Sequence, residues 1–218
     1  GVCPPFTVYP QLGKNPPRPT VPPANPPPAA PATLEGTSLH TGEKVSLTLK
    51  PAPEDHGFKF RRIDLPDQPF ISADVEKVQT VERATTLAEG AVKVHTLEHV
   101  ISALTGMGVD NAIIEMDANE PPIGDGSSRP FVEMIKKVGI VPQNALRRIW
   151  EIREPIHLET GYGTLLTIVP SKTFRVSVTN VGPEGRFTQY FSSEINPETY
   201  EKEISAARTF VYYEDVKP

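Results

Sequence analysis

Proline is concentrated near the start of this chain of 218 residues, where twelve of the 25 prolines lie between Pro4 and Pro31. Because proline lacks a backbone N–H and disfavours helix in the residue before it, a packed core is unexpected there. We therefore predict a disordered, proline-rich leader over residues 1–32 and a globular chain from residue 33. Residues 16–19 have the PxxP pattern of a ligand for an aromatic groove, although this composition is more typical of a linker or an unrelated leader.

The composition excludes several classes of protein. With 27 acidic against 22 basic residues, the net charge of −5 argues against a nucleic-acid-binding protein. No apolar run approaches the roughly 18 residues of a membrane-spanning helix, and no basic start followed by an apolar stretch indicates a targeting signal. The single cysteine, Cys3, excludes an internal disulfide framework and a Cys-rich zinc module. One large or two small globular domains remain.

Hydrophobic periodicity predicts an α+β fold. Apolar residues at helical spacing indicate a helix over residues 94–104, stopped by Gly106 and Gly108. A second helix is expected to start at residues 127–128 and to end at Gly139, and a third to run from Pro197 towards Arg208. Strand patterns occupy residues 45–49, 58–60, 112–116, 149–158, 164–169, 174–178 and 187–191. Helices grouped between strands favour α+β layers, with a first domain over residues 33–144 and a second that starts at residue 145.

The segment His95-Thr96-Leu97-Glu98-His99 is the sharpest chemical feature. On a helix, the His99 side chain would lie on the face opposite the apolar stripe. Glu98 and His95 would lie at angles between that face and the stripe. Imidazole binds zinc, and a neighbouring carboxylate can take a proton from the water that the metal activates. A solvated polar face on an amphipathic helix explains the same spacing equally well.

Three other motifs each have a plain structural explanation beside a functional one. His40, in a loop between two glycines, could reach a ligand or simply belong to a turn. The loop at residues 121–128 could bind an anion at a helix start, or its Asp125 could cap the helix. Thr209 could donate to an oxyanion beside the aromatic Phe210, although nothing in the local chemistry requires it.

Six segments occur together in one order: GTSLHTG at 36–42, RATTL at 83–87, HTLEH at 95–99, GVDNAIIE at 108–115, PPIGDGSSRPF at 121–131 and ISAARTF at 204–210. From about Thr33 to the end, this series resembles the UDP-3-O-acyl-N-acetylglucosamine deacetylases, the zinc amidases of lipid A biosynthesis. The proline-rich leader has no counterpart in the family pattern.

The resemblance implies two similar layered domains, each a sheet with a helix pair, with the active site between them. It gives Glu98 the role of general base and His99 that of a zinc ligand. Thr209 would stabilise the tetrahedral oxyanion, Phe210 would lie beside the acyl-chain passage, and His40 would lie near the substrate.

The implied reaction is hydrolysis of the N-acetyl group of UDP-3-O-acyl-N-acetylglucosamine, which yields acetate and a free amine. The implied cofactor is Zn²⁺, and the partner is an acylated nucleotide sugar with no nucleic acid. The implied setting is the cytoplasm of a Gram-negative bacterium, with peripheral membrane contact compatible with an acylated substrate. No sequence feature selects an oligomeric state or an acyl-chain length.

The family's other two zinc ligands, a His and an Asp, and its acid histidine follow the segment that matches residues 207–210. The remaining histidines, His40, His56, His95 and His157, match none of them. We therefore expect an N-terminal fragment with about two thirds of the family pattern, inactive by itself, with a truncated second domain over residues 145–218 that leaves apolar surface exposed.

Two alternatives remain. The pattern His95-x-x-Glu98-His99 fits a metallopeptidase class in which both histidines bind zinc, but this leaves the other five segments unexplained. The other alternative is a non-catalytic fragment whose proline-rich tail binds partners.

Overall fold

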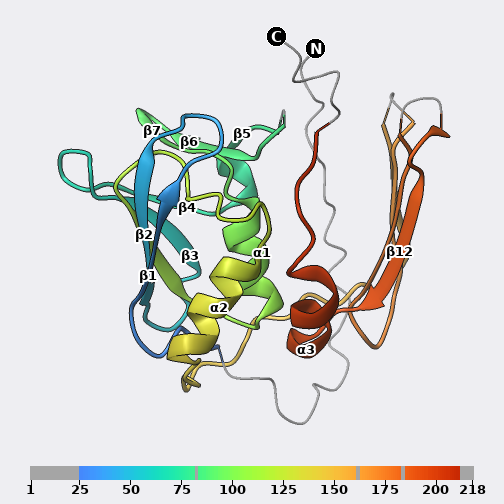
Figure 1. Ribbon diagram of the computed structural model, residues 1–218. Helices are drawn as coiled ribbons and strands as arrows, with labels where there is room; N and C mark the ends of the chain where they lie inside the picture. The colour runs from blue at the N-terminus through green and yellow to red at the C-terminus, as the bar shows by residue number, and fades with distance from the viewer. Residues whose placement is uncertain (1–24, 82, 161–162, 183–184, 212–218) are drawn as a thin grey trace.

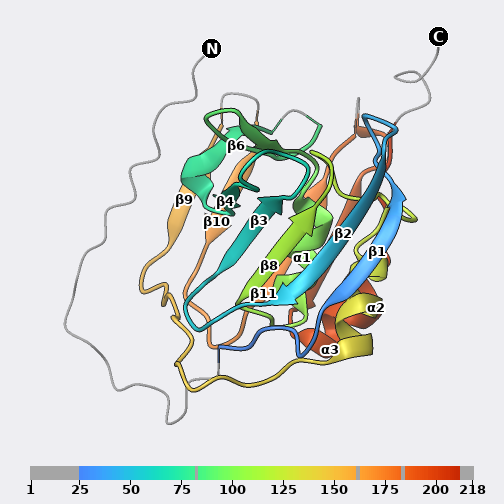
Figure 2. The same cartoon turned by 90° about the vertical axis from the view of Figure 1, so that its left-hand side faces the viewer.

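The computed structural model describes residues 25–81, 83–160, 163–182 and 185–211, and its architecture is α+β, as predicted. The main sheet has the strand order β1-β2-β8-β3-β4, with β3 and β8 parallel and the other pairs antiparallel. Its strands are β1 (Ala32–Thr37), β2 (Lys44–Pro51), β8 (Ala112–Met116), β3 (Phe58–Arg62) and β4 (Phe70–Ser72). Figure 2 shows this sheet in front of the helices that cover its far face.

Two helices, α1 (Glu98–Gly106) and α2 (Arg129–Val138), pack together against the main sheet and share its core. On β2, the alternate residues Val45, Leu47 and Leu49 are buried, as their spacing predicts. In α2, Pro130 lies in the first turn and Gly139 ends the helix with a φ of +77°. The predicted second helix is therefore confirmed, because its start and stop signals are local.

A small three-stranded sheet lies beside the start of α1 (Figure 1). Its strands are β5 (Val78–Thr80), β6 (Thr86–Glu89) and β7 (Val92–Val94), and a short 3₁₀ turn, η1 (Val75–Lys77), precedes them. The sequence analysis missed these strands because three or four residues are too few for a period-two pattern. The sheet nevertheless matters for the site, because β7 leads directly into α1.

The second half of the chain forms two antiparallel hairpins and a short helical segment. Its elements are β9 (Ile156–Glu159), β10 (Leu165–Ile168), β11 (Arg175–Asn180), β12 (Gln189–Glu194), the single turn α3 (Pro197–Thr199) and the π-helical turn η3 (Tyr200–Ile204). Figure 1 shows α3 facing α1 and α2. As expected, much apolar surface is exposed on these hairpins, for example at Leu165, Phe174 and Phe191.

Two predicted elements of this half are longer than the observed ones. The strand expected over residues 149–158 is regular only as β9, from Ile156 to Glu159. The third helix ends at Ile204 and does not run on towards Arg208. The Ser205 hydroxyl donates to the carbonyl of Glu201, a bond that competes with regular helical pairing at this end.

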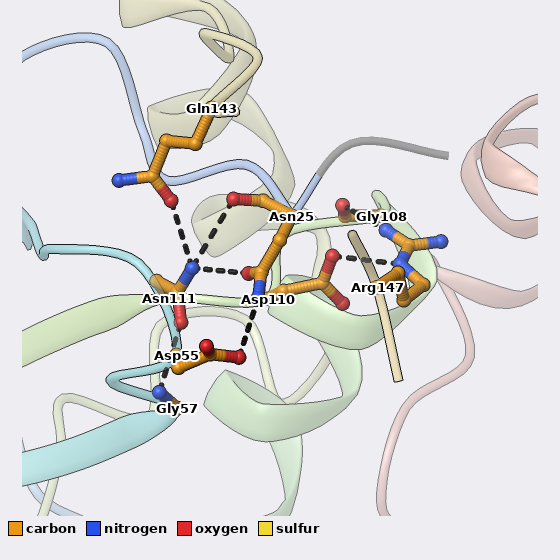
Figure 3. A network of polar contacts seen from close by, with 8 residues as sticks. All are labelled: Asn25, Asp55, Gly57, Gly108, Asp110, Asn111, Gln143 and Arg147. Atoms are coloured by element: carbon orange, nitrogen blue, oxygen red, sulfur yellow. Dashed lines mark hydrogen bonds and ion pairs between the residues drawn. The ribbon is translucent and has the colours of Figure 1, made fainter. Parts of the chain in front are cut away.

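A buried polar network joins the segment before β1 to the connection between the two halves (Figure 3). The Asn111 side chain is 1% exposed; it donates to the Asn25 carbonyl at 3.1 Å and to Gln143 Oε1 at 2.9 Å. Its oxygen accepts from the Gly57 N–H at 2.9 Å. One side chain therefore ties together three segments that lie far apart in the sequence.

Residues 25–31 pack onto the part of the chain that forms the main sheet, α1 and α2, although they fall within the expected leader. The Pro26 carbonyl accepts from the Asp110 N–H at 2.8 Å, and the Ala29 N–H donates to Gly139 at 2.9 Å. Proline has no backbone N–H to donate, but its carbonyl oxygen still accepts hydrogen bonds. A proline-rich segment can therefore pack against a folded sheet, which the expectation of a disordered leader did not consider. The remainder of the leader, including Cys3 and the PxxP segment at 16–19, lies outside the described residues.

Candidate active site

The helix that carries the candidate base and zinc ligand begins at Glu98, four residues later than predicted. Val94 belongs to β7, and Thr96 has a φ of +53°, a left-handed conformation that a right-handed helix excludes. Such a conformation is unusual for a β-branched residue and is most often found at functional sites. The apolar periodicity predicted a helix that begins too early, because side-chain spacing carries no information on the backbone turn at Thr96.

Glu98 and His99 are the first two residues of α1, and both side chains are half-buried. Glu98 Oε1 accepts from the Thr85 N–H at 3.2 Å. Glu98 Oε2 is buried and has no hydrogen-bond partner among the described residues. A buried carboxylate oxygen without a donor is costly, so an unpaired one is typical of an atom that binds a ligand or water.

His95 is not on α1 with His99, which corrects the geometry assumed for both the helix and the metallopeptidase alternative. Its backbone N–H donates to the Asn119 carbonyl at 2.8 Å, and its Nδ1 lies 2.9 Å from Thr86 Oγ1. The H-x-x-E-H arrangement requires the two histidines one turn apart on a single helix. The turn at Thr96 prevents that, so no observation favours the peptidase.

His40 lies in the turn between β1 and β2. Its backbone N–H donates to the carboxylate of Glu120, at 3.2 Å from Oε1 and 3.0 Å from Oε2. Its side chain is exposed and lies within electrostatic range of His95. Burial chiefly lowers the pKa of His95, and the charge of His40 adds to that effect.

The segment that follows η3 runs back towards the end at which α1 begins (Figure 1). There the Thr209 N–H donates to the Gly126 carbonyl at 2.8 Å, and Arg208 lies 3.7 Å from Asp125. Hydrogen bonds from Ser127, with Arg208 nearby, keep the pKa of Asp125 below its usual range. The Ser127 hydroxyl donates to Asp125 at 2.6 Å, but Asp125 does not cap the helix, because the N-cap residue of α2 is Ser128 and it makes no side-chain cap hydrogen bond.

One loop, residues 117–128, contacts all the elements that carry the candidate residues. Glu120, near its start, binds the His40 turn and also Thr96, two residues before Glu98. Gly126, near its end, binds Thr209. The predicted residues from four separate motifs are therefore held around a single loop at one end of the molecule.

Phe210 follows Thr209 and is 68% exposed. A large cavity of about 1040 Å³ opens elsewhere, near the opposite end of α1, and is lined by Gly106, Tyr200 and the apolar face of β11 and β12. The residues around it do not include Glu98, His99, Thr209 or Phe210. The size of that cavity therefore says nothing about the candidate site.

Within residues 25–211 as described, no three His, Cys, Asp or Glu side chains gather closely enough to hold a metal ion. A catalytic zinc site usually has three protein ligands. The imidazole of His99 fits part of such a site as one nitrogen ligand, and the preceding residue, Glu98, has an unpaired carboxylate oxygen. The donor set of the described residues thus fits a zinc centre that needs further ligands.

Comparison with known proteins assigns the family. The model of the family described as UDP-3-O-acyl N-acetylglycosamine deacetylase matches residues 29–218. The chain belongs to the UDP-3-O-acyl N-acetylglycosamine deacetylase family. The resemblance that the six ordered motifs indicated is therefore confirmed. None of the helices in the described part of this family member is long and apolar enough to cross a membrane.

Several curated members of the deacetylase family are similar over most of the chain. A UDP-3-O-acyl-N-acetylglucosamine deacetylase from Legionella pneumophila is 42% identical over 183 residues, which are 83% of this chain and 60% of that protein. One from Saccharophagus degradans is 42% identical over 189 residues, 84% of this chain and 61% of that protein. A bifunctional enzyme LpxC/FabZ from Porphyromonas gingivalis is 39% identical over 185 residues, which are 84% of this chain and 40% of that protein. The chain thus spans about 60% of the length of the first two relatives and less of the third.

Two residues of this deacetylase-family site were missed by the sequence analysis. Thr85 lies in the RATTL segment, but its contribution is a backbone N–H, which carries no side-chain signal. Glu120 directly precedes the Pro121-Pro122 pair and was not singled out, because its partners are 24 to 80 residues away in the sequence.

Proposed function

We propose that this chain forms the base-carrying part of a zinc-dependent deacetylase that hydrolyses the N-acetyl group of UDP-3-O-acyl-N-acetylglucosamine in lipid A biosynthesis. The observation that carries this proposal is the buried, unpaired Oε2 of Glu98, the first residue of α1 and the residue directly before His99. Such an oxygen is suited to take a proton from an attacking water, with acetate and a free amino sugar as products. Membership of the deacetylase family supplies the substrate class.

Each predicted residue has a role in this proposal. Glu98 is held at Oε1 by the Thr85 N–H, so that Oε2 stays directed for proton transfer. His99 supplies one imidazole ligand to Zn²⁺, which when bound polarises the acetamide carbonyl and lowers the pKa of water. Thr209, whose backbone is fixed by Gly126, donates its hydroxyl to the developing oxyanion.

Substrate recognition in this proposal involves exposed side chains on two segments. His40, exposed in a turn whose backbone is tied to Glu120, would contact the polar part of the substrate. Phe210, 68% exposed directly after Thr209, would line the passage for the acyl chain. A nucleotide-sugar substrate places the enzyme in the cytoplasm, and the acyl chain allows peripheral contact with a membrane.

We further propose that the remaining zinc ligands and the acid that protonates the amine lie outside the described residues. This rests on the absence of any cluster of three metal-ligating side chains within the described ranges up to residue 211. It also rests on the relatives' length, of which the chain spans about 60%. By itself, the 218-residue chain is then expected to bind zinc weakly and not to turn over substrate.

The test is a deacetylation assay on UDP-3-O-acyl-N-acetylglucosamine with the protein expressed at the full length of its reading frame. We expect acetate release by the wild type, loss of about 10²- to 10⁴-fold in kcat for Glu98→Gln, and near wild-type activity for His95→Ala. Loss of zinc and activity in His95→Ala would overturn the assignment, because it would make His95 a ligand. A wild type without acetate release would overturn the proposed function itself.

A further inference from the structure

Glu120 carries a completely buried carboxylate, with an exposure of 0%, in the loop between β8 and α2. Its Oε1 accepts from the Thr96 hydroxyl at 2.7 Å. Its Oε2 accepts from the N–H of His40 at 3.0 Å and from that of Thr41 at 3.1 Å. All of these donors come from the two segments that lead to candidate site residues, the His40 turn and the turn into α1.

The bonding pattern explains why this position holds a carboxylate. None of the ion pairs between described residues involves Glu120, so its burial is offset by hydrogen bonds from neutral groups. Both oxygens face donors, and an ionised carboxylate is the side chain of this length that accepts on both sides. An alanine would remove the acceptor of the Thr96 hydroxyl and of the His40 and Thr41 N–H groups. A glutamine could keep these contacts, because its NH₂ group can donate to the Thr96 hydroxyl while its oxygen accepts from the N–H groups.

One of the bonds holds a strained residue. Thr96 has a φ of +53°, and a conformation of this kind costs about 1–3 kcal/mol unless the surroundings stabilise it. The Thr96 hydroxyl donates the hydrogen bond to Glu120, and Thr96 is buried, with an exposure of 7%. Because the turn at Thr96 sets where α1 begins, it also sets the direction of Glu98 two residues later.

We propose that Glu120 is a positioning residue that couples the His40 turn to the start of α1 and so aligns His40 with Glu98 and His99. This inference rests on the proposed deacetylase function. Glu120 touches neither reacting group; it acts through Thr96 on one side and through the backbone of His40 on the other. Displacing a base by an ångström can reduce a rate about 100-fold, so the coupling would appear in kcat.

The experiment compares Glu120→Ala with Glu115→Ala in the protein at the full length of its reading frame, with UDP-3-O-acyl-N-acetylglucosamine as substrate. Glu115 is a matched control, because it is also buried and close in sequence but pairs with Lys50 and Arg61 on the main sheet. We expect Glu120→Ala to lower kcat about 10- to 100-fold with KM within about threefold, and Glu115→Ala to leave kcat within about threefold.

A second pair of variants keeps the test valid if Glu120→Ala does not fold. Thr96→Val removes the hydroxyl and keeps the shape, and should lower kcat, whereas Thr96→Ser keeps the hydroxyl and should retain most of the wild-type kcat. The double variant Thr96→Val with Glu120→Ala should be no slower than Glu120→Ala alone, because each change removes the contact between residues 96 and 120. Additive losses of kcat would overturn the coupling.

A readout independent of turnover separates this inference from the proposed function. In an NMR experiment, the amide protons of His40 and Thr41 should shift and lose exchange protection in Glu120→Ala and not in Glu115→Ala. Unmoved amides, or moved amides with an unchanged kcat, would overturn the positioning role while the deacetylase assignment stands. An inactive wild type would overturn the proposed function, and the positioning role with it.

Discussion

The ring of Tyr200 lies directly against Gly106, so closely that a Cβ on Gly106 would come within 2.4 Å of the ring carbons. The Tyr200 hydroxyl also lies 2.6 Å from Ser102 Oγ, and its side chain is 4% exposed. This contact joins the end of α1 to η3. Because α1 begins with Glu98 and the chain runs from η3 to Thr209, the Tyr200–Gly106 contact controls how these two residues are placed relative to each other.

Gly106→Ala should destabilise the protein by about 1–3 kcal/mol, because the new methyl group would overlap the Tyr200 ring. In the absence of such an overlap, alanine stabilises a helix relative to glycine by up to about 1 kcal/mol. The expected change in the free energy of unfolding therefore has the opposite sign to the one that helix propensity alone predicts. The measurement is the free energy of unfolding in urea. In a Tyr200→Ala background the overlap is gone, and Gly106→Ala should become neutral or stabilising; a cost that persists there would contradict the contact.

Glu98→Gln and His99→Ala should separate catalysis from metal binding. With Glu98→Gln, kcat should fall about 10²- to 10⁴-fold while zinc content stays that of the wild type, because only the proton acceptor is lost. With His99→Ala, zinc should be lost together with activity, because one ligand is removed. Metal analysis of the purified proteins beside the acetate assay decides this. Zinc retained at full occupancy in His99→Ala would refute its ligand role.

Asn111→Ala should destabilise the protein by about 3 kcal/mol. The change leaves the Gly57 N–H without its acceptor, and the Asn25 carbonyl and the Gln143 side-chain oxygen without this donor (Figure 3). Chemical denaturation measures the loss. Asn180→Ala, on an exposed position of β11, is the matched control and should change the free energy of unfolding by less than about 0.5 kcal/mol. Equal effects of the two changes would show that the network contributes nothing.

Acid should destabilise the fold partly through His95. Burial, followed by the charges of Lys93, His40 and Arg62, lowers the pKa of His95, and Glu120 opposes this. The unfolded chain therefore binds the proton more tightly, so stability from neutral His95 is complete above pH 6.5 and is lost as the pH falls below it. His95→Gln should flatten the dependence of unfolding free energy on pH between about 5 and 7.

A second histidine, His56, contributes to the same dependence of the free energy of unfolding on pH and allows a comparison with His95. Burial and then the charge of Lys59 lower the pKa of His56, so its effect has the same sign. His56→Gln should flatten the curve separately, and the double variant with His95→Gln should flatten it most. An unchanged slope in His95→Gln, measured in parallel with the wild type, would contradict the burial of that imidazole.

Local signals were sufficient for the elements that form within one stretch of chain. The alternation over Val45, Leu47 and Leu49 predicted β2, and Pro130 and Gly139 marked the first turn and the end of α2. The family could also be predicted, because six motifs kept their order along the chain. In these cases the determining residues are neighbours in sequence, so no knowledge of distant contacts was needed.

The start of α1 could not be predicted in this way. It depends on the left-handed turn at Thr96, and that turn is stabilised by Glu120, 24 residues further along. The role of Glu120 itself depends on the backbone of His40, 80 residues away. A hydrogen bond between such distant groups leaves no periodic pattern, and only the folded chain brings the donor to the acceptor.

The sequence by itself therefore determined which groups are candidates for the chemistry: a carboxylate and an imidazole at Glu98 and His99, with Thr209 far along the chain. The tertiary structure decided where these groups lie. The loop at 117–128 binds the His40 turn, the start of α1 and Thr209, and the Tyr200–Gly106 contact holds the other end of α1. Side-chain chemistry is a property of single residues, whereas alignment depends on contacts between segments that meet only after folding.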